Sequence, residues 1–323
     1  MTEKSLVSVV IPTYRRHELL RVCLRSVVDQ TYPNLEILVC DDGDEATTAA
    51  VVEEFADPRV TYVPRRPHLG MHGNVFEGLR AASGDYLIKI DDDDWWHSDL
   101  IASLMEPFEE DPKLAVTFCD HFVVDGTGNL QLDRTDDNSQ YWGRADLAEG
   151  RHEPFRHLAV AGTLPMQFCA LMRRSALDLE GVPPEVAGVY DLWLAYLTSR
   201  AGEAAWYVPQ RLAYYRVHEG SETASGRLRV EQATLFCLRE FLADPAMSAV
   251  HPLARQRIKR MSAEYALALL RVKKPREARR ALRLCPGSLL SPRGAAAATM
   301  ALLPSGAGDR VFRLFDRLTS GRA

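Results

Sequence analysis

The sequence predicts an α/β protein with a mostly parallel sheet flanked by helices and a helical extension at the C-terminal end. Two observations predict the sheet: short runs rich in β-branched residues alternate with amphipathic segments, and polar residues follow the end of nearly every run. A third observation predicts the extension, because the pattern from about residue 230 onward is almost entirely helical. With 323 residues and 46% hydrophobic content, the chain is long enough to bury a core.

Strand and helix signals alternate in order through the first part of the chain. A β-branched run ended by proline, at 5–12, precedes a segment at 16–30 with apolar residues close to the helical period. The alternation continues with strands predicted at 35–42, 59–65 and 85–90 and helices at 44–56 and 73–83. In parallel sheets of this kind, ligands collect at the carboxyl ends of the strands.

The rest of the chain is expected to hold fewer strands. A helix end and a further strand are predicted within 111–125, and the polar stretch 126–153 is predicted to be a long loop, either functional or disordered. Helices are predicted at 230–244 and, as a pair broken at Pro275, within 257–285. These patterns predict a catalytic domain over 1–226 and a helical region over 227–323.

Charge differs between the two parts. Residues 227–323 carry 19 Lys and Arg against 7 Asp and Glu, whereas residues 1–226 carry 20 against 37. The acidic part disfavours nucleic acid as a partner, because a phosphate backbone needs a basic surface, and a phosphate bound there needs a metal. The basic part is expected to be a solvated helix face, with an anionic membrane or polymer as the alternative.

Cysteine usage and hydropathy predict the compartment. The six cysteines are scattered without a CxxC pair, which is typical of buried thiols in a reducing compartment. The N-terminal apolar run is too short for a signal peptide, and no window reaches the ~18 apolar residues that span a bilayer. We therefore expect a cytoplasmic protein, at most peripheral to a membrane. Apolar spacing at 235–242 indicates packing or a homodimer, with membrane contact by segment 308–318 as the alternative.

Four consecutive aspartates, Asp91 to Asp94, follow the strand predicted at 85–90 and precede two tryptophans. Adjacent carboxylates repel one another, so they are either solvated by water or hold a cation. The apolar strand and the tryptophans favour a cation, because a solvated acidic turn does not need rigid surroundings. Mg²⁺ or Mn²⁺ prefers such oxygen ligands, with substrate phosphates completing the shell.

A second acidic pair, Asp41 and Asp42, follows the strand predicted at 35–42. Carboxylates at this place accept hydrogen bonds from a base N–H or from ribose hydroxyls. The structural alternative, a turn that caps the next helix, applies to Asp44. No glycine-rich phosphate loop follows the first strand. A nucleoside diphosphate held by carboxylates and a metal is consistent with both acidic clusters.

Several motifs resemble, in order and spacing, those of the family 2 glycosyltransferases: VSVVIPTYRR, the DDG after the second strand, HLGMHGNVFEGLRAASGDYLIKIDDDDWW, and YDLWLAYLTSR followed by LAYYRVHEGS. The resemblance covers residues 5 to about 222. It implies the GT-A fold, a nucleotide-sugar donor, a divalent metal (Mn²⁺ or Mg²⁺) and inversion at the anomeric carbon.

Position by position, the resemblance implies a donor site. Asp42 matches the carboxylate that reads the base, and Arg15 replaces an asparagine that is common in relatives. Asp93 matches the metal ligand of the D-x-D motif, and His218 a histidine that completes the metal site in some relatives, with a structural histidine as the alternative. The positions implied to bind the nucleotide sugar are Pro12, Thr13, Tyr14, Arg15, Asp42, Gly70, Asn74, Asp91 and Asp92.

The general base is where the sequence departs from the family. An inverting displacement needs a base that takes the proton from the acceptor hydroxyl. The resemblance aligns the usual aspartate with Val189 and a common arginine with Ala195. Asp191 is the nearest carboxylate and the predicted catalytic base, although two helical residues turn a side chain by about 200°. The alternatives are no catalysis or a base elsewhere, for which the candidates are His152, His157 and Glu185.

The predicted function is transfer of a sugar from a UDP-sugar, or next a dTDP-sugar, to a hydroxyl acceptor. A glycan, a lipid-linked intermediate or a secondary metabolite is the expected acceptor. The substitution at Val189 motivates an alternative, a non-catalytic scaffold or partner subunit that binds the nucleotide sugar. A sugar-1-phosphate nucleotidylyltransferase is disfavoured, because PTYRRHE lacks the glycines of a triphosphate-binding loop.

Overall fold

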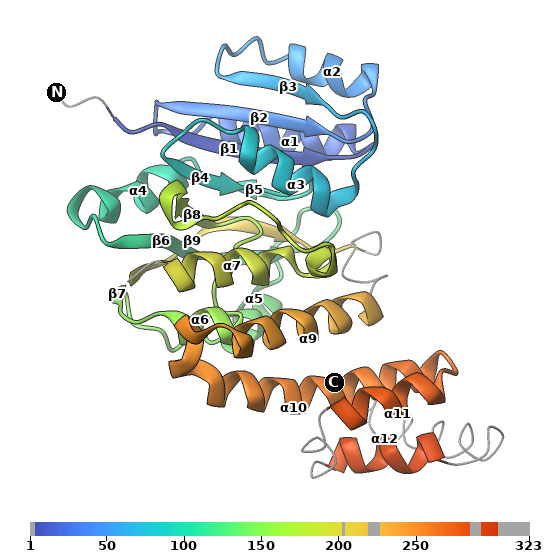
Figure 1. The fold of residues 1–323 in the computed structure, drawn as a ribbon. Coiled ribbons are helices and arrows are strands. Elements are labelled where there is room, and N and C mark those ends of the chain that lie inside the picture. The colour runs from blue at the N-terminus through green and yellow to red at the C-terminus, as the bar shows by residue number, and fades with distance from the viewer. Residues whose placement is uncertain (1–3, 202–203, 219–226, 285–291, 303–323) are drawn as a thin grey trace. The chain divides into compact units, whose positions relative to one another are not determined.

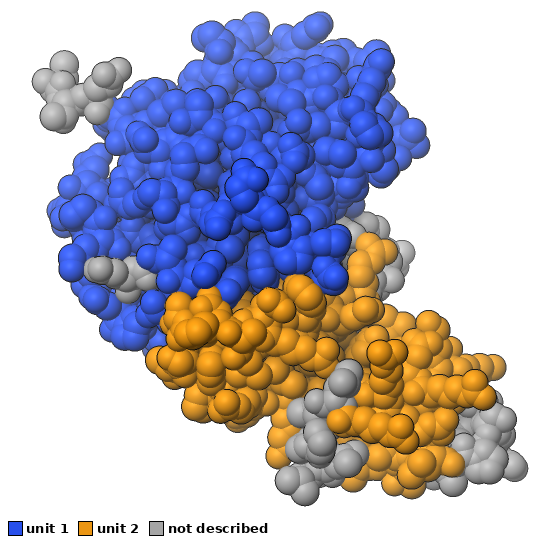
Figure 2. All heavy atoms as spheres, in the orientation of Figure 1, with its two compact units in different colours: residues 1–221 blue, residues 222–323 orange. Residues whose placement is uncertain are grey.

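The structure, a computed structural model, describes residues 4–201, 204–218, 227–284 and 292–302. The chain divides into two compact units, Met1–Ser221 and Glu222–Ala323, which Figure 2 colours separately. The domain boundary predicted after residue 226 falls at the end of a stretch outside the described residues, and it stays a prediction.

The described strands of unit 1 form one nine-stranded sheet (Figure 1). Its order is β3-β2-β1-β4-β8-β6-β9-β5, and β7 pairs with β9 in addition. Strands β1 to β4 are mutually parallel where they pair, β8 is antiparallel to β4 and β6, and β6 is parallel to β9. The strands are β1 (Val7–Thr13), β2 (Leu35–Asp41), β3 (Val60–Pro64), β4 (Tyr86–Lys89), β5 (Trp95–Trp96), β6 (Leu114–Val124), β7 (Gly150–His152), β8 (Ala170–Arg173) and β9 (Ala204–Arg216).

Helices cover both faces of this sheet. Successive residues of a strand point to opposite faces, and Val9 of β1 belongs to the same buried cluster as Leu20 of α1. Val10 points the other way, toward α3, where a Cβ added at Gly78 would lie 2.6 Å from Val10 Cγ1. The helices of unit 1 are α1 (His17–Val28), α2 (Ala46–Glu53), α3 (Gly70–Ala81), α4 (Leu100–Glu110), α5 (Leu132–Tyr141), α6 (Arg156–Ala161) and α7 (Tyr190–Ala201), with 3₁₀ helices η1 (Arg174–Ala176) and η2 (Pro184–Gly188).

The prediction of a long loop over 126–153 is wrong, because this stretch contains α5 and β7. Only Thr135 and Ser139 of α5 are buried, so the helix has no apolar stripe that a sequence pattern could reveal. Polar contacts fix it to β6 instead: the main-chain N of Val123 donates to Thr135 Oγ1 at 2.9 Å, and Ser139 Oγ donates to Asp120 at 2.5 Å.

Unit 2 is helical in its described part, as the sequence predicts. Its helices pack through small apolar side chains, among them Ala266 of α10, Ala278 of α11 and Ala297 of α12. The predicted break is confirmed, since Pro275 is the first residue of α11. No helix among the described residues is both long enough and apolar enough to cross a membrane. Segment 308–318 lies outside the described residues. The elements are α9 (Arg227–Ala243), η3 (Pro245–Val250), α10 (His251–Arg271), α11 (Pro275–Leu284) and α12 (Pro292–Leu302).

Candidate functional site

The loop that follows β1 touches the acidic loop that follows β4. Thr13, the last residue of β1, donates a hydrogen bond from Oγ1 to Asp92 Oδ2 at 2.8 Å. Arg16 Nη1 lies 3.1 Å from Asp92 Oδ1 and 2.8 Å from Asp93 Oδ2. Between them, Arg15 has a φ of 57°, in the left-handed region that asparagine tolerates better than arginine. The asparagine that relatives often carry here therefore suits the backbone of this loop.

His218 reaches the acidic loop from the segment after β9. Its Nε2 lies 3.0 Å from Asp93 Oδ2, and the side chains of His218 and Asp93 are 21% and 12% exposed. Arg216, two residues earlier, donates from its main-chain N to Asp94 Oδ1 at 2.8 Å and from Nε to the Asp93 carbonyl at 2.9 Å. The structure thus brings Asp93 and His218 together, while their role as metal ligands stays a prediction.

A buried lysine faces Asp91 on the other side of this loop. Lys89, the last residue of β4, is fully buried and forms an ion pair with Asp91. Its Nζ also donates to the Gln167 carbonyl at 2.9 Å and to the Tyr190 hydroxyl at 2.5 Å. A lysine charge is costly to bury unless anionic and polar partners surround it. Lys89 therefore ties Asp91 to the start of α7.

Burial raises the pKa values of three aspartates in the acidic loop. It raises the pKa of Asp92 to about 6, while Arg16 acts in the opposite direction. Burial also raises the pKa of Asp91, against the effect of Lys89, and raises the pKa of Asp94 well above its usual value. Buried carboxylates stay ionised only when positive charge lies close to them. Arg16 and Lys89 supply such positive charge to this loop.

Asp41 organises the turn between β2 and α2. It is fully buried, and its carboxylate accepts hydrogen bonds from the main-chain N–H of Gly43 at 2.8 Å and of Glu45 at 2.9 Å. The turn suggested for Asp44 is therefore made by Asp41, and Asp44 forms an ion pair with Arg66 instead. Because the Asp41 carboxylate stabilises this turn, Asp42 is the residue of the pair that we expect to contact a ligand.

Asp42 lies between the end of β2 and the start of α3. Its Oδ1 accepts a hydrogen bond from the main-chain N–H of Leu69 at 2.7 Å, and its Oδ2 lies 2.8 Å from His68 Nδ1. The His68 ring lies 5.0 Å from the ring of Tyr14, which is 44% exposed. Asp42 and an exposed aromatic side chain thus border the same edge of the sheet.

Three further residues predicted to bind the nucleotide, Gly70, Asn74 and Pro12, lie near the ends of β1 and β2 and the start of α3. Gly70 starts α3 with a φ of +73°, a conformation that glycine adopts without a Cβ penalty. Asn74 is 1% exposed; its Nδ2 donates to the Cys40 carbonyl at 2.7 Å, and its Oδ1 accepts from Arg65 Nε at 3.3 Å. Pro12 lies in β1, opposite Cys40. Contact between these residues and a nucleotide stays a prediction.

The predicted base lies at the start of α7. Val189 follows η2, and Asp191 is a half-buried residue in the first turn of α7. Between them, Tyr190 places its hydroxyl 2.5 Å from Lys89 Nζ and 3.5 Å from Asp91 Oδ2. The first turn of α7 therefore lies beside the acidic loop.

The alternative bases lie on three other elements. His152 is the last residue of β7, and its Nε2 lies 2.8 Å from the Ala148 carbonyl oxygen. His157 belongs to α6, and Glu185 belongs to η2, the element directly before Val189.

The donor atoms present fit a divalent ion that receives further ligands from a substrate. Asp93 Oδ2 and His218 Nε2 converge, yet no group of three His, Cys, Asp or Glu side chains in the described part of the chain could hold a metal ion. Mg²⁺ and related ions are often held by one or two protein ligands, with water and substrate phosphates in the other positions. The Asp93 carboxylate satisfies that pattern, and the His218 imidazole would be an additional ligand.

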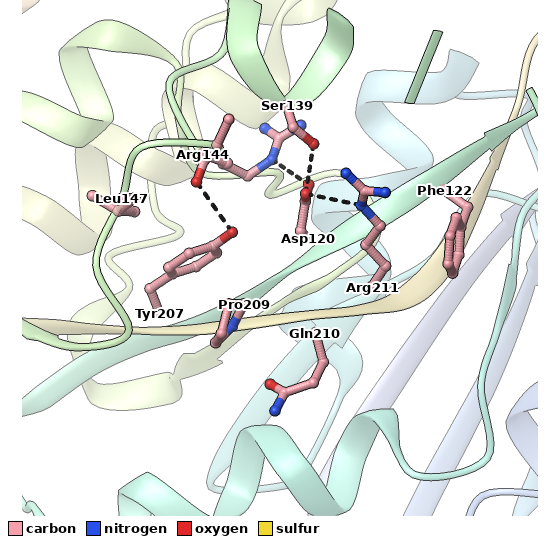
Figure 3. A pocket seen from close by; sticks show the side chains of 10 residues that line it. Asp120, Phe122, Ser139, Arg144, Leu147, Tyr207, Pro209, Gln210 and Arg211 are labelled. Carbon is pink, nitrogen blue, oxygen red and sulfur yellow. Dashed lines mark hydrogen bonds and ion pairs between the residues drawn. The ribbon is translucent and has the colours of Figure 1, made fainter. Parts of the chain in front are cut away.

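A separate pocket of about 480 Å³ is lined by residues of β6, β9, α5 and the segment after α5 (Figure 3). Asp120 accepts hydrogen bonds there from Ser139 Oγ at 2.5 Å and from Arg144 Nε at 2.8 Å, and Arg211 Nε lies 3.5 Å away. Despite burial, Arg144 and Ser139 lower the pKa of Asp120. Asp120 thus lies beside two arginines, and its hydrogen bond with Ser139 links α5 to the sheet.

The first part of the chain matches a known protein family. The profile of glycosyl transferase family 2 matches residues 8–179, a span that includes the loop after β1, Asp42 and the four aspartates. The chain belongs to glycosyl transferase family 2. The family predicted from the sequence motifs is therefore confirmed.

Curated relatives in the family match this chain over part of their own length. Chondroitin synthase of Escherichia coli is 30% identical over 235 residues, which cover 72% of this chain and 32% of that protein. The Escherichia coli enzyme WfgD, named a UDP-Glc:alpha-D-GlcNAc-diphosphoundecaprenol beta-1,3-glucosyltransferase, is 36% identical over 91 residues, or 28% of this chain and 36% of that protein. The chain thus spans about a third of the length of either relative.

Solved structures of related glycosyltransferases share the fold. Mannosyltransferase PcManGT from Pyrobaculum calidifontis, in complex with GDP-Man and Mn²⁺, has a TM-score of 0.57 and 20% identity, with 99% of this chain and 88% of that chain covered. S. aureus TarS 1–349, in complex with UDP-GlcNAc, has a TM-score of 0.60 and 16% identity, with 95% and 81% covered. The predicted GT-A fold is confirmed.

Four residues that contact the predicted site residues were not predicted from the sequence. Arg16, Lys89 and Tyr190 contact the aspartates, and His68 contacts Asp42. A signal existed for Lys89, because a lysine inside the apolar strand YLIK needs a buried anionic partner. The other three lie in loops or at helix starts, where no periodic pattern indicates which way a side chain points.

Proposed function

We propose that this protein is an inverting glycosyltransferase that moves a sugar from a nucleotide-diphosphate donor to an acceptor hydroxyl with the help of Mn²⁺ or Mg²⁺. A UDP-sugar is the first candidate donor and a dTDP-sugar the second. The observation that carries the proposal is the convergence of Asp93 and His218, at 3.0 Å, beside Asp92 and the loop after β1. Family membership supports the reaction class, and the structures bound to UDP-GlcNAc or GDP-Man support the donor class.

The donor would lie along the carboxyl ends of β1, β2 and β4. Asp42 would accept a hydrogen bond from the base, and the exposed ring of Tyr14 would border it. Pro12, Thr13, Arg15, Gly70 and Asn74 would shape this pocket through the loops that they hold. Asp91 or Asp92 would contact the ribose or the sugar. A carboxylate accepts hydrogen bonds from ribose hydroxyls but repels a phosphate, so Asp91 and Asp92 suit a ribose better than a phosphate.

Asp93 and His218 would hold the metal against the diphosphate of the donor. A divalent ion there supplies electrostatic stabilisation of the charge that builds on the leaving nucleotide. Lys89 holds Asp91 in place, and Thr13 holds Asp92, so the acidic loop keeps its shape before the donor arrives.

Asp191 would be the general base. The contact of Tyr190 with the Lys89 and Asp91 pair supports this role, since it keeps the first turn of α7 next to the acidic loop. A base must reach the acceptor hydroxyl on the face opposite the leaving group, and a carboxylate in this turn is close to where that hydroxyl must lie.

The acceptor is proposed to be a hydroxyl of a glycan, of a lipid-linked intermediate or of a secondary metabolite. The activity that names WfgD, on a diphosphoundecaprenol-linked sugar, supports the lipid-linked class. A cytoplasmic protein in peripheral contact with the membrane would reach such an acceptor. Unit 2 would serve in packing, in dimerisation or in contact with the acceptor.

A second candidate is a non-catalytic scaffold that binds the nucleotide sugar. Val189, in the place where relatives carry the usual aspartate, favours it, and the retained acidic loop disfavours it. The two candidates differ in turnover, so the test is a donor-hydrolysis assay with UDP-glucose, UDP-GlcNAc and dTDP-glucose in Mn²⁺. Slow release of UDP or dTDP that is lost in Asp93→Asn and Asp191→Asn supports the enzyme. Binding without any release, in the presence of lipid-linked and oligosaccharide acceptors, supports the scaffold.

A further inference from the structure

One nitrogen of Arg16 contacts two of the four aspartates. Arg16 Nη1 lies 3.1 Å from Asp92 Oδ1 and 2.8 Å from Asp93 Oδ2. The same oxygen of Asp93 lies 3.0 Å from Nε2 of His218. A guanidinium and an imidazole therefore share one carboxylate oxygen.

That shared oxygen lies where the proposed metal would bind. An ion held by Asp93 and His218 would bring a second positive charge to the oxygen that Arg16 contacts, and a guanidinium keeps its positive charge at every pH that the protein experiences. Two cations in contact with one oxygen repel each other strongly where little water separates them. Arg16 therefore opposes metal binding for as long as it contacts this oxygen of Asp93.

Without a metal, Arg16 has a stabilising task. Asp92 is 2% exposed and lies next in sequence to Asp93, so the two carboxylates repel each other in a region with little solvent. The Arg16 side chain, by contrast, is 29% exposed and therefore borders solvent. Arg16 is thus placed to neutralise Asp92 and Asp93 when no metal is bound, at a position from which it can reach solvent.

We infer that Arg16 is an internal counter-ion, which occupies the metal position in the free protein and moves to the donor diphosphate when metal and donor bind together. The inference rests on the metal-dependent donor binding proposed above. A guanidinium pairs with phosphate oxygens as well as with carboxylate oxygens, so the exchange keeps Arg16 paired. Its consequence is cooperativity: the metal binds weakly alone and much more tightly with the nucleotide.

The test measures free Mn²⁺ by electron paramagnetic resonance during titration of the full-length protein, with and without UDP. The variants are Arg16→Gln, Arg16→Lys and, as a matched control, Arg21→Gln. Arg21 lies in α1, which begins directly after Arg16, and pairs with Glu18 and Glu54, so its loss removes an equal charge away from the aspartates.

Arg16→Gln is expected to bind Mn²⁺ without nucleotide roughly tenfold or more tightly than the wild type, since a competing charged hydrogen-bond donor is gone. Arg16→Lys, which keeps a cation there, and Arg21→Gln should both stay close to the wild type. UDP should raise the Mn²⁺ affinity of the wild type more than that of Arg16→Gln. In EDTA, Arg16→Gln should unfold at a lower temperature than the wild type. Mn²⁺ should reduce this difference in unfolding temperature.

Two results would overturn the inference in distinguishable ways. If Arg16→Gln binds Mn²⁺ no more tightly than the wild type, while Asp93→Asn removes Mn²⁺ binding, Arg16 does not compete with the metal but the proposed metal site stands. If neither the wild type nor Arg16→Gln binds Mn²⁺, with or without UDP, both the counter-ion role and the metal-dependent function fail.

Discussion

Asp93 Oδ2 and His218 Nε2 lie 3.0 Å apart, although 125 positions separate the two residues in the sequence. One strand pairing makes this contact: β5 pairs with β9, so that Trp95, just after the acidic loop, lies opposite Tyr214, just before the histidine. Their rings stack at 5.1 Å with an interplanar angle of 9°, which stabilises the pairing. Two separate sequence motifs thereby contribute to one site.

Replacement of Asp93 by asparagine is expected to abolish metal-dependent binding of the nucleotide and to leave the fold intact. Asparagine keeps the shape of the side chain but lacks the charge that a hard divalent ion requires. The measurement is calorimetric titration with UDP in Mn²⁺, together with a thermal unfolding curve. The matched control is Asp99→Asn, at a residue that bonds to Thr31 instead, and it should bind UDP like the wild type. Unchanged UDP affinity in Asp93→Asn would exclude Asp93 as the ligand.

Replacement of Lys89 by methionine is expected to lower the free energy of unfolding by about 3 kcal/mol, because it leaves Asp91 largely buried without its counter-charge. The double variant Lys89→Met/Asp91→Asn should regain much of this loss, since the unpaired charge is then absent. Urea unfolding of both variants and of Asp91→Asn completes a double-mutant cycle. If the effects of the two single variants simply add, the ion pair does not stabilise the protein.

Stability is expected to fall in mild acid because of His121. Burial lowers the pKa of His121 to about 3, whereas an unfolded histidine titrates near 6.5. Between these pH values the unfolded chain binds a proton that the folded protein does not. Each such proton lowers the free energy of unfolding by up to about 1.4 kcal/mol per pH unit as the pH falls.

The variant His121→Phe tests this origin, because phenylalanine keeps an aromatic ring 4.8 Å from that of Phe168 without a titratable group. Urea unfolding at several pH values from 7 to 4 should give a shallower decline for His121→Phe than for the wild type. The control is His97→Phe, at a residue whose side chain is 49% exposed, and it should follow the wild type. Parallel declines for His121→Phe and the wild type would contradict the assignment.

Replacement of Gly78 by alanine is expected to destabilise the protein by about 1 to 3 kcal/mol, although alanine favours helices. The added Cβ would lie 2.6 Å from Val10 Cγ1 and 3.0 Å from Cys40 Sγ, both in buried strands. Val10→Ala should relieve the clash, so that the double variant loses less than the two single losses together. Thermal unfolding of the three proteins decides this, and an increase in stability of Gly78→Ala alone would show that α3 moves away from the sheet at little cost.

The sequence could predict much of the sheet because its strands are apolar throughout. All seven residues of β1 are buried, and α1 buries Leu20, Leu24 and Val27 at helical spacing. Such patterns follow directly from strand and helix geometry. Helix α5 could not be predicted in the same way, since its contacts with the sheet include two hydroxyl groups and an ion pair of Asp136, which sequence periodicity does not register.

The site could be predicted only as far as its motifs extend. Asp93 and His218 were identified because each lies in a recognisable motif, and the strand pairing then joined them. Arg16 was not, because its direction depends on the left-handed turn at Arg15 rather than on any repeat. The role of Asp191 as general base stays a prediction; the structure shows the hydroxyl of its neighbour Tyr190 3.5 Å from Asp91 Oδ2.

The most direct test of the central claim is calorimetric titration of the purified protein with UDP, dTDP and GDP, each in Mn²⁺ and in EDTA. The account predicts that UDP or dTDP binds in Mn²⁺ and that the same nucleotide binds at least about tenfold more weakly in EDTA, which corresponds to a loss of about 1.4 kcal/mol. Absence of binding by all three nucleotides, or equal binding in Mn²⁺ and in EDTA, would contradict a metal-dependent nucleotide site at Asp93 and His218.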